Sequence, residues 1–199
     1  MRIGILALLA ILSGLPAGAG AVEDLIAGTR KECRGCDLTG ASFKKANLAG
    51  VDLSGAILTD ASFHRANLRG AILDGVKASG ANFNLVEAAL ASFKGADLSR
   101  ALMYGAQMSG ADFSDADLTD ARLQTARLTS ANLAGAVLDR AAAREAVANN
   151  ADFSGASMQQ TNLNGASLGR SIFDGARSAM PVSSMPSTAV PALPGRRSR

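Results

Sequence analysis

The chain has 199 residues, enough for one domain with flanking segments, and its apolar share of 48% is enough to fill a core. It contains no Trp, one Tyr (Tyr104) and one His (His64), which argues against ordinary packing of large, varied side chains. The net charge of +3 comes from the ends, because residues 36–175 carry 12 Lys and Arg against 14 Asp and Glu, a net charge of −2. A near-neutral body argues against a phosphate-binding face, so no nucleic-acid partner is expected.

Residues 1–21 have the pattern of a secretory signal peptide. Arg2 gives a basic start, residues 3–12 are apolar, and Ala19 and Ala21 form an A-x-A cleavage site before Val22. The apolar stretch is too short to span a membrane, and no transmembrane segment is expected in the mature chain. The sequence therefore predicts a periplasmic or secreted protein, with an uncleaved N-terminal anchor as the alternative.

Residues 22–35 are expected to form an N-terminal cap. Val22, Leu25 and Ile26 are spaced as one face of a short amphipathic helix, placed just before a long repeat. Since the open edges of a repeat protein invite aggregation, a helix here would cover the first coil.

Cys33 and Cys36 form a C-x-x-C motif within this segment. A structural zinc site needs four ligands, whereas the chain offers two Cys and the distant His64. The βαβ context of a thioredoxin-like redox pair is missing. In an oxidising compartment a structural disulfide is the prediction, with free or redox-active thiols as the alternative.

Residues 36–175 repeat with a period of five, without an insertion, for 28 units. The central position of each unit is apolar, with 14 Leu, 7 Phe, 3 Met and 4 Ala, and a small residue lies two positions before it. Neither a helix, with a period of 3.6, nor a strand, with a period of two, explains this pattern. A turn in every unit does, so the chain must coil around a narrow axis.

The Phe residues give the length of one coil. All seven occupy central positions, in two series spaced by multiples of 20: Phe43, Phe63 and Phe83, then Phe93, Phe113, Phe153 and Phe173. Stacking of like side chains on successive coils therefore predicts four units per coil, with the two series on opposite walls of the core. On the outside, Arg100, Asp120 and Arg140 would stack with alternating sign.

Two segments interrupt the pattern. Ala78 and Ala88 replace large central residues near one coil, and Ala143 and Ala148 do so where the signature is lost. The second segment, residues 141–150, could leave the coil as a small helical bulge, because it is rich in Ala. Residues 176–199 are rich in Pro, Ser and Ala without a repeat, which predicts a disordered tail. Its basic end could contact an anionic surface or remain solvated.

Units such as residues 46–50 (ANLAG), 96–100 (ADLSR) and 131–135 (ANLAG) resemble the A-(D/N)-L-x-x signature of pentapeptide-repeat proteins. The resemblance covers about 70% of the chain. It implies an all-β fold, a right-handed four-sided β-helix of about seven coils. At a spacing of ~4.8 Å per coil, this rod would be ~34 Å long.

The candidate chemistry favours binding over catalysis. His64 is the only His and follows a central Phe, while the many Ser and Asp are explained as turn residues, so no catalytic, metal or cofactor site is expected. The prediction is a non-enzymatic exported scaffold that binds an unknown protein or envelope component. The resemblance offers one alternative, since acidic family members mimic DNA and bind type II topoisomerases. The near-neutral body and the export signal disfavour it.

Overall fold

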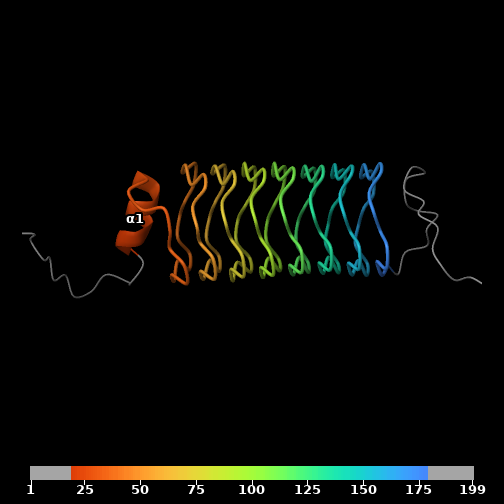
Figure 1. Cartoon of the computed structure of the whole chain (residues 1–199), viewed down its shortest axis with the longest axis horizontal. Helices are drawn as coiled ribbons and strands as arrows, with labels where there is room; N and C mark the ends of the chain where they lie inside the picture. The colour runs from red at the N-terminus through yellow and green to blue at the C-terminus, as the bar shows by residue number, and fades with distance from the viewer. Residues whose placement is uncertain (1–18, 179–199) are drawn as a thin grey trace, which may run out of the picture.

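The computed structural model describes residues 19–178. They form a rod of stacked turns with one helix, α1 (Ala19–Ala27), across its N-terminal end (Figure 1). Residues 1–18 of the predicted signal peptide and residues 179–199 of the predicted tail lie outside the described residues.

Single-residue parallel bridges join the turns. Each bridge links a residue to the one 20 positions further on, from Glu32 with Asp52 to Ser157 with Arg177. Backbone hydrogen bonds run along the same register, as from the N–H of Phe63 to the carbonyl of Asn82 at 2.7 Å. One turn of the coil therefore takes four units, the period that the Phe spacing predicts.

The Phe rings form two stacks inside the rod. Phe43 lies 5.0 Å from Phe63, which lies 4.9 Å from Phe83, and the second series repeats this spacing. Phe83 contacts Phe93 edge to face at 6.0 Å, at the point where the Phe series changes from one side of the core to the opposite side. These rings and the small Ala residues between them are buried and form the core of the rod.

The fifth residue of each unit, and in many units the second, explains the turns. An Asp or Asn at the second position accepts a hydrogen bond from the N–H two residues later, as Asp97 does from Ser99 at 3.0 Å. The fifth residue has a positive φ in all 28 units, and in only 13 of them is it Gly. The A-(D/N)-L-x-x signature thus encodes one small and one large inward side chain and one turn per unit.

The coil begins one unit earlier than the sequence predicts. Cys33 occupies a central position, is 2% exposed, and follows Glu32, which already pairs with Asp52. Residues 31–35 thus belong to the coil and not to a separate cap. Lys31-Glu32-Cys33-Arg34-Gly35 lacks the small first residue of the signature, which is why the pattern alone missed it.

Residues 141–150 stay in the coil and form no helical bulge. Ala142 pairs with Asn162, and the central residues Ala143 and Ala148 are buried. The backbone hydrogen bonds between turns do not depend on the central side chain, and the residue count is unchanged, so small central residues do not displace the chain.

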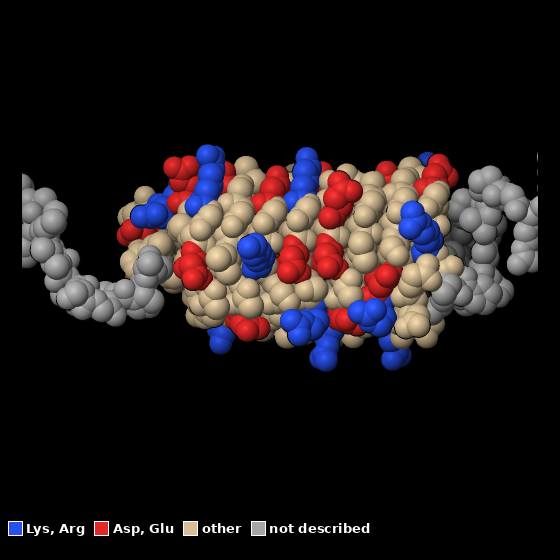
Figure 2. All heavy atoms as spheres, turned by 90° about the horizontal axis from the view of Figure 1, so that it is seen from below, with Lys and Arg blue, Asp and Glu red and all other residues tan. Residues whose placement is uncertain are grey.

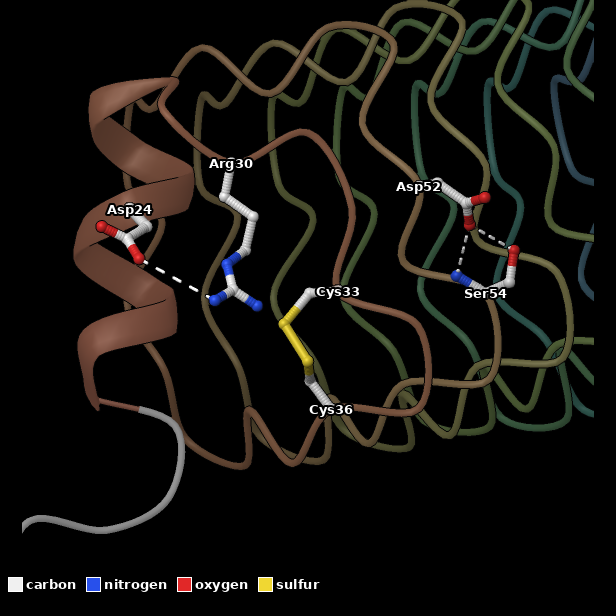
Figure 3. Close-up of a disulfide and its surroundings, with 6 residues drawn as sticks. All are labelled: Asp24, Arg30, Cys33, Cys36, Asp52 and Ser54. Atoms are coloured by element: carbon white, nitrogen blue, oxygen red, sulfur yellow. Dashed lines mark hydrogen bonds and ion pairs between the residues drawn. A yellow bond between two sulfur atoms is a disulfide. The ribbon is translucent and has the colours of Figure 1, made fainter.

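Helix α1 packs against the first turn through Leu25, which is buried, and Val22, which is partly buried. Ile26 instead points outward with 46% exposure, so the predicted apolar face is narrower than its spacing suggests. The helix ends at Ala27 and is followed by Gly28, whose φ of 72° suits the left-handed residue that terminates a helix. Beyond it, Cys33 and Cys36 are joined by a disulfide beside Arg30, which pairs with Asp24 (Figure 3).

We expect Phe63→Ala to lower the free energy of unfolding by about 3–5 kcal/mol, because it removes a ring stacked on both sides and leaves a cavity. Lys44→Ala changes an exposed side chain at the unit position directly after the central one, and it should alter the free energy of unfolding by less than about 0.5 kcal/mol. Urea denaturation of both variants measures the difference. Equal losses would show that the inward and outward positions have been assigned wrongly.

Candidate functional site

Within residues 36–175 the four-unit turn gives the rod four walls of seven units each. Residues 31–35 precede wall 4 as one further unit and are not counted in it. Wall 1 comprises the units that begin at residue 36 and every 20th residue after it. Walls 2, 3 and 4 comprise the units that begin at residues 41, 46 and 51 and recur in the same way. Walls 2 and 4 therefore lie on opposite sides of the rod, as do walls 1 and 3.

Tyr104 stands out in the middle of wall 2. It is the only Tyr of the chain, is 53% exposed, and projects between two shallow hollows of about 310 and 220 Å³. Its backbone N–H donates to Oδ1 of Asn84 at 2.8 Å, which fixes the turn that presents the ring. The patch around Tyr104 is completed by the other residues that line these hollows: Asn84, Leu102, Arg122, Gln124, Thr125, Arg144 and Glu145.

The backbone beside this patch adopts an unfavourable conformation. Leu85 and Thr125 both have φ values near 57–58°, in the left-handed region that branched side chains avoid. Between them lies Gly105, where an added Cβ would stand 2.8 Å from Cδ2 of Leu85. Gly105 therefore makes room for a leucine in this conformation, as Gly110 does for Leu90.

The ionic side chains are distributed unevenly over the walls. Within residues 36–175, wall 2 carries five cations and one anion, and wall 3 carries three cations and one anion. Wall 4 carries one cation and six anions, and wall 1 carries three cations and six anions. The net charges are thus +4 and +2 on walls 2 and 3, the basic side, and −5 and −3 on walls 4 and 1, the acidic side.

The near-neutral body therefore conceals two charged sides, which the sequence total did not reveal. The ion-paired residues of the repeats lie on the acidic side, where acidic and basic side chains interleave (Figure 2). Arg140 binds Asp120 through two hydrogen bonds of 2.8 and 2.9 Å, which lower the pKa of the Asp120 carboxyl and raise that of the guanidinium. Arg100, the third residue of this predicted column, donates to Ser79 instead.

The other residues singled out in the sequence lie apart from this patch. His64 is half-buried on wall 2, two turns before Tyr104, and accepts or donates no side-chain hydrogen bond within residues 19–178. The disulfide of Cys33 and Cys36 borders a separate open hollow at the N-terminal end.

In the described part of the chain, no three His, Cys, Asp or Glu side chains are grouped as metal ligands. Across the same residues, no helix is both long and apolar enough to cross a membrane.

Sequence reasoning did not identify Tyr104 and its neighbours as a site. The signal was available, because Leu85, Leu102 and Tyr104 are large apolar or aromatic residues at outward positions, where most units carry small or polar ones. Only after the 20-residue period is applied do they fall on one wall beside Arg122.

Comparison with known proteins gives one family. The profile of pentapeptide repeats matches residues 32–60, 46–84, 91–129, 121–160 and 151–177, in eight copies. No curated protein matches the chain significantly in sequence.

Among solved structures, QnrB1, a plasmid-mediated fluoroquinolone resistance protein, is 22% identical with a TM-score of 0.50, over 74% of this chain and 79% of that one. HetL, a protein involved in heterocyst differentiation regulation from the cyanobacterium Nostoc sp., is 25% identical with a TM-score of 0.32, over 83% and 98%. A protein of the Arabidopsis thaliana thylakoid lumen is 29% identical with a TM-score of 0.19, over 64% and 69%.

We expect Thr125→Asn to raise the free energy of unfolding by about 1 kcal/mol, because Asn tolerates the left-handed region far better than a β-branched residue. The reverse change at the same unit position, Asn150→Thr, should lower it by a similar amount. Thermal and urea denaturation measure both. A loss of stability in Thr125→Asn would show that the backbone beside Tyr104 is not strained.

Proposed function

Since the chain belongs to the pentapeptide-repeat family, whose fold is a right-handed quadrilateral β-helix, we propose that it is a non-enzymatic exported scaffold that binds another protein. The binding surface is the patch around Tyr104 on wall 2. The exposed Tyr104, held between two hollows, carries this proposal.

The composition of the patch suits a protein interface. Tyr and Arg are enriched where proteins meet, and an aromatic side chain that fills a partner pocket dominates the binding energy. Tyr104 supplies such an anchor, and Arg122 and Arg144 flank it. Because each turn is hydrogen-bonded to the next, the wall is rigid, and a partner would not have to order it on binding.

A binding role fits this surface better than catalysis. The hollows beside Tyr104 are lined by amide, hydroxyl and guanidinium groups and by Glu145, with no His or Cys among them. A convergent acid, base and nucleophile would be needed for catalysis.

Export is the second part of the proposal, and the N-terminal end supports it. Cleavage before Val22 would remove only the first three residues of α1 and leave Leu25 against the first turn, so that the rest of α1 can cap the rod. An oxidising compartment would maintain the disulfide of Cys33 and Cys36.

We expect intact-mass measurement of protein from a periplasmic fraction to show a chain that begins at Val22 and is two hydrogens lighter than the reduced form. Alkylation before lysis should leave both cysteines unmodified, because the disulfide is already formed. A chain that still carries Met1 would count against export. Alkylated cysteines would count against the disulfide alone.

The alternative, inhibition of a type II topoisomerase by DNA mimicry, is weaker. Duplex DNA carries one negative charge per ~1.7 Å, so a rod of ~34 Å would need on the order of 20 anionic charges to match it. The acidic side has 12 anions and 4 cations, a net charge of −8. The likeness to QnrB1 concerns the fold and brings no activity to this chain.

We expect Tyr104→Ala to reduce, by at least tenfold, the amount of partner crosslinked and co-purified with the chain from an envelope fraction, because the anchor side chain is lost. Thr119→Ala, at the same unit position on wall 1, is the matched control and should have no effect. Quantitative mass spectrometry of the crosslinked species measures both. An equal yield from wild type and Tyr104→Ala would remove the patch from consideration as the binding surface.

A further inference from the structure

From the opposite charges of walls 2 and 4 we infer that the chain associates side by side with copies of itself, wall 2 of one copy lying against wall 4 of the next. This inference rests on the proposed function, because it identifies the protein that meets the patch around Tyr104 as a second copy of the chain.

The charges of the two walls are complementary. Wall 2 has a net charge of +4 and wall 4, on the opposite side, of −5. A copy moved sideways without rotation therefore brings a basic wall against an acidic one. Both walls follow the same 20-residue register, so their columns of side chains have the same spacing along the rod.

The choice between Asp and Asn shows that this charge separation goes beyond the needs of the fold. Both residues accept the same turn hydrogen bond, as Asp97 does from Ser99 and Asn82 from Asn84, each at 3.0 Å. At this second position of residues 36–175, all six Asp nevertheless lie on the acidic side, and four of the five Asn lie on the basic side. The turn does not distinguish the two residues, so another constraint sorts them by charge.

The cations of the basic side form no ion pair within residues 19–178. Of the eight Lys and Arg on walls 2 and 3, none forms an ion pair with a carboxylate of residues 19–178. On the acidic side, by contrast, Lys94 pairs with Asp112 and Arg140 with Asp120. The basic side thus presents free positive charge at an exposed surface, which attracts an anionic surface over a Debye length.

Tyr104 also finds suitable groups on the opposite wall. The wall 4 unit that follows it by half a turn contains Asp112 and Asp115, and the exposed carboxylate of Asp115 accepts no hydrogen bond from residues 19–178. Carboxylates at this height can accept the phenolic O–H of a neighbouring copy. A contact between opposite walls leaves a free wall on each copy, so it extends into rows and does not close into a dimer.

The contact is small, and the association should therefore be weak and reversible. A wall ~34 Å long and about 12 Å wide offers roughly 400 Å² per partner, below the ~800 Å² typical of stable complexes. Attraction between exposed charges then contributes much of the affinity, so the rows should form at low ionic strength and dissociate in salt.

Sedimentation velocity on the full mature chain tests this inference. At about 0.02 M salt the sedimentation coefficient should rise with protein concentration, and at about 0.5 M salt it should be that of a monomer. Arg122→Glu with Arg144→Glu reduces wall 2 to a net charge of zero, and Asp115→Lys with Asp174→Lys reduces wall 4 to −1. Each double variant alone should associate at least tenfold more weakly. Lys45 and Lys94 show that Lys is accepted at both unit positions.

An equimolar mixture of the two double variants gives the sharpest result. One retains its acidic wall and the other its basic wall, so together they should form a 1:1 dimer that grows no further. Arg127→Glu with Arg170→Glu makes the same change in net charge on wall 3 and should leave the rows intact. Tyr104→Ala should weaken association without changing its salt dependence.

Three results would each overturn the inference. The wild-type chain could stay monomeric at low salt, the mixture of the two double variants could form no dimer, or the wall 2 and wall 3 variants could lose association equally. Tight binding of a 20-base-pair duplex by a monomeric wild type, lost in the wall 2 variant, would replace it with a polyanion site. If self-association fails while a Tyr104-dependent foreign partner is still captured, the proposed function stands and only the second copy is excluded.

Discussion

The fold depends on a register of 20 residues between hydrogen-bonded turns. Each backbone N–H that points along the rod finds its acceptor on the neighbouring turn, as from Phe63 to Asn82, and this holds only while the count is kept. An insertion would displace every later column by one position and turn inward side chains outward. Because no insertion occurs over 28 units, the walls are flat and each residue has a fixed position on one of them.

Much of this architecture could be read from the sequence, because the period appears directly in the residue types. The spacing of Phe43, Phe63 and Phe83 gives the length of one turn without reference to any relative. What failed was inference from similarity of individual units to the signature. Residues 31–35 and 141–150 depart from it and still follow the coil, because backbone hydrogen bonds, which the sequence does not display, hold them there.

The candidate surface was less accessible to sequence reasoning for a different reason. Charge was summed along the chain, whereas the rod distributes it around an axis, so residues that cancel in the total lie on opposite sides. Tyr104 and Arg122 are 18 residues apart in sequence but line the same hollow. Once the period is known, writing the sequence in rows of 20 is sufficient to recover both the patch and the charged sides.

The use of Asn on the basic side has a consequence for the ageing of the protein. Spontaneous deamidation of Asn passes through a cyclic imide that opens to Asp or to isoaspartate, and the Asp product can still accept the turn hydrogen bond that Asn82 or Asn162 accepts. The coil would tolerate Asp, whereas isoaspartate adds one atom to the backbone and would disturb the register of the turn. Either product adds one negative charge to wall 2 or 3, so the two sides of an old molecule would become progressively more alike.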